Sequence, residues 1–230
     1  MRRLIVAAAL SCALALPCIA ADGPGLTAAA YPPAQILPAP PADGSPAQKR
    51  ELDEIHQAQS GMTEADFARA AADDKAEDAS AFNAVVGVDL KVLPKTWALL
   101  ATVRNEEKGA AKLAKNYFQS NRPWVLDPAL KTCTRADAPQ SSYPSGHSTM
   151  GYSMAIVLAA LVPDKAPAIL DRARTYAENR IVCGVHYRSD IVAGQALGTA
   201  VAEKLLADPR FAADFGAAKS ELQNAINGTH

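Results

Sequence analysis

From Ser45 onward, apolar residues recur three or four positions apart along most of the chain, and strand-like alternation is almost absent. This spacing is typical of amphipathic helices. Glycine and proline interrupt the pattern and mark the expected ends of the helices. The pattern predicts helices over about residues 46–59, 63–75, 77–87, 94–119, 146–162, 164–181, 189–206 and 209–227.

The helical part reads as one unit, because no Gly/Ser-rich linker and no internal repeat divides it. We therefore expect an all-α fold with a single compact helical domain over residues 46–230, a length that can bury a sizeable core. The apolar runs after His147 and Asp190 are short for membrane spans and are interrupted by Ser153 and Gln195. They are expected to be core helices, without stable membrane insertion.

The first twenty residues have the pattern of a secretory signal peptide. Two arginines follow Met1, an apolar run extends from Leu4 to Leu16, and small residues stand at the expected cleavage site near Ala20. We predict a signal peptide over 1–20 and a periplasmic or secreted protein. A membrane anchor and lipid attachment at Cys18 are the alternatives, but the run is short and Ala15-Leu16-Pro17 is a poor lipid-attachment context.

Residues 21–45 form a different segment. Seven of the sixteen prolines lie between Gly23 and Pro46, with little periodicity. This composition predicts a proline-rich extended arm.

Net charge and cysteine content indicate which partners and which covalent cross-link to expect. The formal net charge is -1, and removing Arg2 and Arg3 with the signal makes it -1 - 2 = -3, so no nucleic-acid partner is expected. Of the four cysteines, Cys133 and Cys183 remain in the mature chain. An even pair in an exported protein favours a disulfide between them over two free thiols.

Three separate segments carry cations or imidazoles. Lys115, Arg122 and Arg180 suit a phosphate-sized anion, because guanidinium groups match paired phosphoryl oxygens and an ammonium adds a compact charge. Pro123 disfavours the helical region at Arg122, so we expect the preceding helix to end there and Arg122 to lie at a pocket. Each residue taken alone could equally be a solvated surface cation.

The second segment, Tyr143-Pro144-Ser145-Gly146-His147, precedes an apolar helix. A helix that begins there directs free N–H groups and its positive dipole end at an anion, and Gly146 permits close approach. His147 could then protonate a departing alkoxide. The alternative is an ordinary helix start, with Ser145 or Ser148 as the N-cap.

In the third segment, His186 and Asp190 are four residues apart, so they share a face at a helix start. A carboxylate behind an imidazole fixes its tautomer and stabilises its cation, which a nucleophilic histidine needs. A surface His/Asp contact is the alternative, and the nearby Arg180 favours the active-site interpretation.

Together these blocks, K-x6-R-P, P-S-G-H and R-x5-H-x3-D, closely resemble the signature of the phosphatidic-acid-phosphatase type 2 superfamily. That superfamily includes the bacterial class A non-specific acid phosphatases and the vanadium haloperoxidases. The contexts Y-P-S-G-H-S and C-G-V-H-Y-R-S-D resemble class A, from about residue 38 to the C-terminus. Asn179 departs from the pattern, since the family usually has serine before the arginine.

The resemblance implies a role for each residue. Phosphate would be bound by Lys115, Arg122, Ser145, Gly146 and Arg180. His186 would attack phosphorus, Asp190 would orient it, and His147 would protonate the leaving alcohol and then activate water. No metal or other cofactor is required, because fixed cations and N–H dipoles neutralise the transition-state charge.

The function expected from these roles is an exported acid phosphatase that hydrolyses small phosphomonoesters through a phosphohistidine and admits phosphotransfer to other alcohols. Phosphate or vanadate should inhibit it, and the relatives suggest a homo-oligomer. Two alternatives remain: a vanadate-dependent haloperoxidase, against which the short chain argues, and a non-catalytic phosphate-binding protein, which would need only the cations. We expect the two histidines to need opposite protonation states at one acidic pH.

Overall fold

The computed structural model describes residues 30–228, and in this part of the chain every regular element is a helix. The all-α expectation is confirmed, whereas the expected signal peptide lies outside the described residues. The α-helices are α1 (Pro33–Ile36), α2 (Pro46–Gly61), α3 (Glu64–Lys75), α4 (Asn83–Val86), α5 (Pro94–Phe118), α6 (Pro123–Leu126), α7 (Gly146–Leu161), α8 (Ala166–Val182), α9 (Arg188–Leu206) and α10 (Pro209–Asn227). Short 3₁₀ turns cover Ala79–Phe82, Leu90–Val92 and Pro163–Lys165.

Two expected elements differ from the structure. The single helix expected over 77–87 is a 3₁₀ turn followed by α4, because the Asp78 side chain accepts from Ser80 N at 2.9 Å and starts a new turn. Gly87, with φ of 87°, ends it. Pro123 does not end α5, which stops at Phe118; it stands at the first position of α6, where proline is well accommodated.

The proline-rich arm lies against the helices in the part that is described. The residues that flank α1, Pro32 and Leu37, are extended. The prediction of a fully extended arm is wrong at α1 itself, which begins at Pro33 because the fixed φ of proline suits the first turn of a helix. Tyr31 and Leu37 are buried in the main apolar core. The Tyr143 hydroxyl donates to Pro38 O at 2.6 Å, which ties the arm to the loop before α7.

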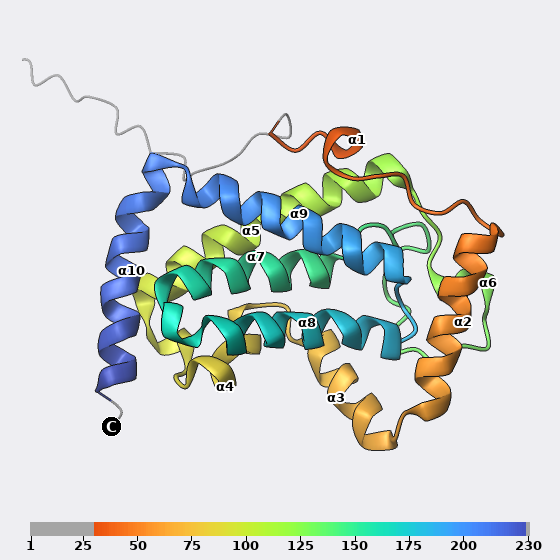
Figure 1. The fold of residues 1–230 in the computed structure, drawn as a ribbon, viewed down its shortest axis with the longest axis horizontal. Helices are drawn as coiled ribbons and strands as arrows, with labels where there is room; N and C mark the ends of the chain where they lie inside the picture. The colour runs from red at the N-terminus through yellow and green to blue at the C-terminus, as the bar shows by residue number, and fades with distance from the viewer. Residues whose placement is uncertain (1–29, 229–230) are drawn as a thin grey trace, which may run out of the picture.

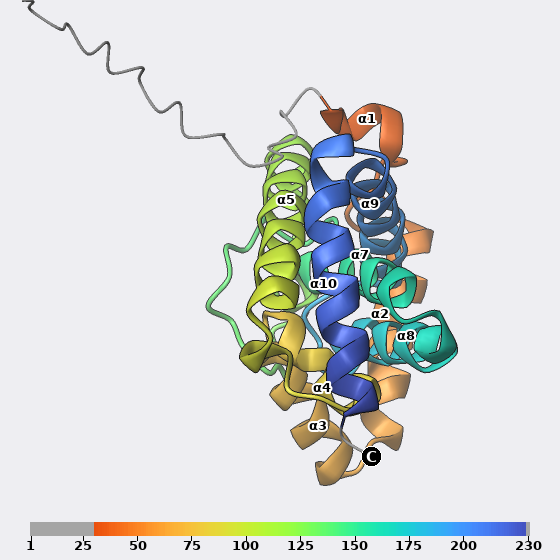
Figure 2. The ribbon, with the colours of Figure 1, turned by 90° about the vertical axis from the view of Figure 1, so that its left-hand side faces the viewer.

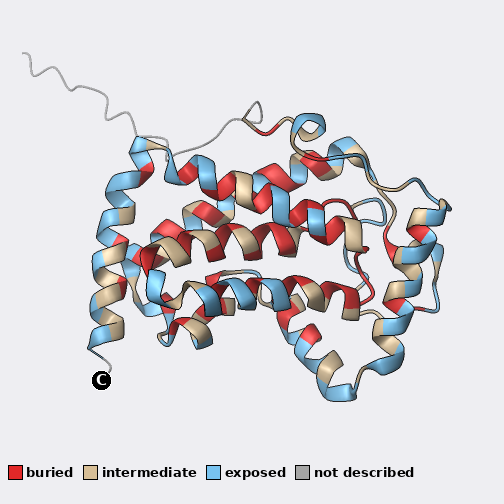
Figure 3. Cartoon of the chain, in the orientation of Figure 1, coloured by how far each residue is buried: buried red, intermediate tan, exposed pale blue. Residues whose placement is uncertain are grey.

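Helix α7 occupies the centre of the molecule. It packs against α5, α8 and α9, and α10 crosses their far end (Figures 1 and 2). Much of α7 is buried (Figure 3), including Met150, Met154, Leu158 and Leu161. A helix that is apolar around most of its circumference is stable only when other helices surround it.

Glycines on α9 set its distance from α7. A Cβ at Gly194 would lie 2.6 Å from Ser145 O, and one at Gly198 would lie 2.5 Å from Thr149 O. Both are backbone atoms that no side-chain rotation can move. The two helices can therefore approach this closely only with glycine at these positions. As a result Ser145 N donates to Asp190 O at 3.0 Å, which joins the first turns of α7 and α9.

Replacing Gly198 by alanine tests this close approach. Gly198→Ala should lower the free energy of unfolding by about 1–3 kcal/mol, because the added methyl group forces the helices apart. The matched control is Gly216→Ala on α10, where a Cβ meets nothing within 4 Å. Alanine there should raise stability by up to about 1 kcal/mol, since glycine is a poor helix former. Equal unfolding free energies for the two variants in urea titrations would contradict this account.

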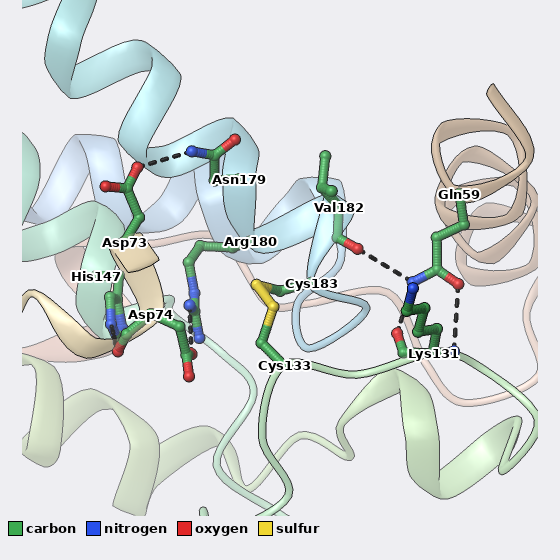
Figure 4. The surroundings of a disulfide bond; sticks show 10 residues. All are labelled: Gln59, Asp73, Asp74, Lys131, Cys133, His147, Asn179, Arg180, Val182 and Cys183. Carbon is green, nitrogen blue, oxygen red and sulfur yellow. Dashed lines mark hydrogen bonds and ion pairs between the residues drawn. A yellow bond between two sulfur atoms is a disulfide. The ribbon is translucent and has the colours of Figure 1, made fainter. Parts of the chain in front are cut away.

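A disulfide joins Cys133 to Cys183, 50 residues apart in sequence (Figure 4). Cys133 lies in the loop between α6 and α7, and Cys183 follows the last residue of α8. Cys133 N also donates to Cys183 O at 3.2 Å. The bond therefore holds a long loop against the end of the helix that carries Arg180.

Removing this bond should lower the free energy of unfolding by about 2–4 kcal/mol, because the unfolded chain gains freedom over a long loop. The measurement is chemical denaturation of the Cys133→Ser/Cys183→Ser variant beside the wild type, each with and without reductant. Reductant should destabilise only the wild type. Two free thiols in unreduced protein exported to the periplasm would show that the bond does not form there.

Candidate active site

A cavity of about 380 Å³ opens where α5, the loop before α7 and the start of α7 meet. Side chains that are distant in sequence share its wall. They are Glu77, Arg104, Glu107, Lys108, Ala111, Lys112, Lys115, Asn116, Arg122, Asp137, Ser141, Gly146, His147, Met150 and His186. The volume exceeds that of a phosphate ion and leaves room for an attached organic group.

Two cations face the cavity from opposite ends of one loop. Lys115 stands in the last turn of α5 and donates to Ser141 O. Arg122 caps α6, is buried, and pairs with Asp137 at 3.0 Å. Burial and the neighbouring guanidinium of Arg122 lower the pKa of Lys115. A bound anion would favour the protonated lysine.

Arg180 lies behind His147 in the last turn of α8 and is fully buried. Its Nη1 donates to Asp74 Oδ1 at 2.6 Å, while its Nε and Nη2 have no hydrogen-bond partner among the described residues. Buried guanidinium donors without a partner are costly. Arg180 does not itself line the cavity, but it shares Asp74 with the lining residue His147, and its free donors are what an anion-binding arginine requires.

The C-terminal end of α3 supports this arginine and the first histidine together (Figure 4). The Asp74 carbonyl lies 3.0 Å from His147 Nε2. Because a carbonyl only accepts, Nε2 carries the proton, and Nδ1 is left to gain or lose a second one. The neighbouring Asp73 accepts from Asn179 Nδ2 at 2.7 Å, so the residue that departs from the family pattern has a local partner.

His186 and Asp190 form a buried pair. The Asp190 Oδ2 atom lies 3.1 Å from His186 Nδ1 and also accepts from Ser142 Oγ at 2.5 Å and from Tyr187 N at 2.9 Å. Asp190 is the third residue of α9, where a carboxylate also benefits from the helix dipole. With Nδ1–H donated to Asp190, the lone pair of His186 is on Nε2.

Arg122 faces that lone pair. Its Nη1 lies 3.1 Å from His186 Nε2 and donates to Val185 O at 3.0 Å. A guanidinium only donates, so this contact agrees with an unprotonated Nε2. The nitrogen that could attack phosphorus and one of the cations that could hold its oxygens are therefore adjacent.

Both imidazoles are less basic than usual. Burial first, and then Arg122 and Lys115, lower the pKa of His186 well below its ordinary value. Burial and Arg180 do the same to the pKa of His147, against a smaller opposing effect of its hydrogen bond to Asp74. We expected different environments for the two rings, but buried cations act on both. Burial also raises the pKa of Asp190, while its donors from Ser142 and Tyr187 hold it down.

The start of α7 contributes mainly backbone groups. Ser145 is buried and its Oγ accepts from Ser148 N at 3.3 Å, so the hydroxyl caps the helix and is not part of the cavity wall. The N–H groups of Gly146 and His147 have no acceptor within the helix. Gly146 lines the cavity opposite Lys115.

Several residues that support the site carry no motif. Asp137, Ser141 and Ser142 lie in a loop without periodicity, and sequence reasoning missed them. Asp74 offered a weak signal, because two consecutive aspartates close the expected helix 63–75, where the helix dipole disfavours negative charge. The described residues contain no group of three or more His, Cys, Asp or Glu disposed to hold a metal ion.

Comparison with known proteins agrees with the motif. The family model described as the PAP2 superfamily matches residues 96–209. An acid phosphatase of Zymomonas mobilis is 33% identical, over 86% of this chain and 78% of its own length. A non-specific acid phosphatase of Salmonella typhimurium is 30% identical, over 83% of this chain and 80% of its own.

A solved structure extends the likeness to the fold. The transmembrane PAP2-type phosphatidylglycerolphosphate phosphatase of Bacillus subtilis matches with a TM-score of 0.54 at 18% identity, over 70% of this chain and 85% of its own. Within residues 30–228 of the present protein, by contrast, no helix combines the length and apolar character needed to cross a membrane. From the motif, the fold and the two acid phosphatases together, the chain belongs to the PAP2 superfamily and, within it, to the bacterial non-specific acid phosphatases.

Proposed function

We propose that this protein hydrolyses phosphomonoesters through a covalent phosphohistidine on His186. The observation that carries the proposal is the buried Asp190–His186–Arg122 arrangement, with a carboxylate on Nδ1 at 3.1 Å and a guanidinium on Nε2 at 3.1 Å. It gives the imidazole one defined tautomer, with the lone pair directed at a cation that can bind phosphate. A protein that only bound phosphate would need the cations but not this tautomer.

In the substrate complex, Lys115, Arg122 and Arg180 hold the phosphoryl oxygens, with the N–H groups of Gly146 and His147 as further donors. The Arg122 N–H that points at His186 Nε2 turns to donate to a phosphoryl oxygen instead. The lone pair on Nε2 is then free to attack phosphorus. Ser145 contributes through the helix start that it caps. These fixed donors stabilise the charge that spreads over the equatorial oxygens in the transition state.

In the first step, His186 Nε2 attacks phosphorus and the bond from phosphorus to the leaving oxygen breaks. His147 gives its Nδ1 proton to that oxygen, so the alcohol leaves neutral. Asp190 stabilises the positive charge that the phosphorylated imidazole carries. In the second step His147 takes a proton from water and the water oxygen attacks phosphorus. The bond between phosphorus and His186 Nε2 breaks, phosphate is released, and His186 returns to its neutral form.

The proposed location is the periplasm or the cell exterior. The secretory pattern over residues 1–20 supports it, and so does the Cys133–Cys183 disulfide, because such bonds persist in oxidising compartments. The same pair also keeps the Arg180 end of α8 against the loop that carries Asp137 and Ser141.

The covalent step predicts different outcomes for the two histidine variants. His186→Ala should abolish p-nitrophenyl phosphate turnover and the acid-labile phosphoenzyme. His147→Ala should still form the phosphoenzyme from p-nitrophenyl phosphate, since that leaving group needs little protonation. The reaction is stopped at alkaline pH, which preserves an acid-labile phosphohistidine, and peptide mapping then locates the phosphoryl group. A phosphoryl group on a residue other than His186 would overturn the assignment.

The lowered pKa values predict an acidic optimum. An imidazole with a depressed pKa is neutral over most of the pH range and gains a proton only as the pH falls below that value. Activity should fall at high pH as His147 loses its proton and at low pH as His186 gains one, and the negative charge of bound substrate further favours protonation of His147 in the complex. The kcat/KM profile should therefore be a bell on the acidic side of neutrality.

The leaving group separates the two histidines in this profile. His147→Ala should slow an alkyl phosphate by about 10²- to 10⁴-fold and p-nitrophenyl phosphate far less, with a shallower alkaline limb for the latter in the wild type. Profiles of kcat/KM for both substrates, in wild type and variant, supply the measurement. Equal slowing of both substrates would remove His147 from the general-acid role.

A further inference from the structure

The end of the cavity away from His186 contains a buried carboxyl group that the reaction does not use. Glu107 lies on α5 eight residues before Lys115, so the two are about 12 Å apart along the helix axis. Both line the same cavity. A phosphoester whose phosphate binds at Lys115 would extend its organic group toward Glu107.

Glu107 has one oxygen in use and one free. Arg104 Nη1 pairs with Glu107 Oε1, whereas Glu107 Oε2 is buried without a hydrogen-bond partner among the described residues. Arg104 is fixed in turn by Glu77, with its Nε 2.8 Å from Glu77 O and its Nη2 3.1 Å from Glu77 Oε2. Buried polar atoms usually have partners, so a free oxygen in a cavity wall points to a ligand.

The charges of Arg104 and Glu107 suit an uncharged polar group on the organic part of the substrate. Burial raises the pKa of Glu107 to about 8, against the opposing effect of Arg104, with smaller effects of Glu77 and Lys108. At acidic pH the carboxyl group is therefore protonated and does not repel a phosphate dianion. Arg104 has five N–H donors, of which the three contacts described use three. The free guanidinium donors therefore lie beside a carboxyl oxygen that, when protonated, both donates its O–H and accepts.

We propose that Arg104 and Glu107 form a leaving-group subsite that recognises the hydroxyls of a polyhydroxylated phosphomonoester, an inference that rests on the proposed phosphatase function. Each hydroxyl both donates and accepts, as this pair does. The Arg104 side chain, 21% exposed, meets the leaving group first, and Glu107, 1% exposed, fixes the guanidinium and offers Oε2 behind it. A purely structural ion pair would affect stability without affecting the choice of substrate.

The test compares ribitol 5-phosphate with n-pentyl phosphate, which has the same carbon chain without the hydroxyls. Wild-type kcat/KM should favour the ribitol ester by at least about 10-fold, and Glu107→Leu should lower that ratio by about 10- to 100-fold. Glu107→Gln keeps a donor and an acceptor, so its ratio should stay within about threefold of wild type. Arg104→Met should lower the same ratio by a similar factor. This variant provides the test if Glu107→Leu does not fold.

Two controls separate the possible failures. Thr102→Ala, at a partly exposed position of the same helix that does not line the cavity, should leave the ratio unchanged. Absence of p-nitrophenyl phosphate turnover in the wild type would count against the proposed function itself. Normal turnover with a wild-type ratio near one, or an equal loss of both esters in Glu107→Leu and Arg104→Met, would overturn only the subsite.

Discussion

The site depends on concentrating positive charge in a buried cavity and balancing it with carboxylates from separate segments. Asp74 on α3 holds Arg180, Asp137 in the loop before α7 holds Arg122, and Asp190 on α9 holds His186. Isolated buried charges are prohibitively costly, so the two arginines persist only because each pairs with a carboxylate, whereas Lys115 donates to the Ser141 carbonyl and has a lowered pKa. Burial and the same cations lower the pKa of both imidazoles, which in the proposed mechanism keeps His186 available as a nucleophile without a metal ion.

This balance requires exact placement of helix ends, and the core supplies it. Helix α7 lies inside the bundle, and Gly194 and Gly198 let α9 approach its backbone. The N-termini of both helices consequently meet at the Ser145–Asp190 hydrogen bond. The start of α7 presents N–H groups to the cavity, and the start of α9 places the Asp190 carboxylate against His186. The close packing of the α7 and α9 backbones thus determines the geometry of the candidate site.

Sequence periodicity predicted the long helices to within a few residues, because apolar residues recur at helical spacing in each and proline, glycine or capping residues mark most of their ends. It failed at 77–87, where the Asp78 side chain competes with helical hydrogen bonding. The motif residues could be named because their types and spacing are distinctive. Asp74, Asp137 and Ser142 could not, because a carboxylate or hydroxyl acquires its role only when folding brings it against a particular arginine or histidine. Glu107 had one readable signal: it interrupts an apolar stripe that includes Val103, Ala110 and Ala114.

The roles proposed for the two histidines are distinguished by their hydrogen bonds rather than by their basicity. Burial and nearby cations lower the pKa of both rings, so pKa alone does not separate the proposed nucleophile from the proposed acid. His186 has a carboxylate on Nδ1, and a full negative charge stabilises the cation formed when the opposite nitrogen is phosphorylated. His147 has only the Asp74 carbonyl on Nε2, a weaker partner that orients the ring and leaves Nδ1 free to exchange a proton. In the proposed mechanism the negative charge of the substrate takes the place of a carboxylate beside His147, so protonation of this imidazole is coupled to occupancy of the site.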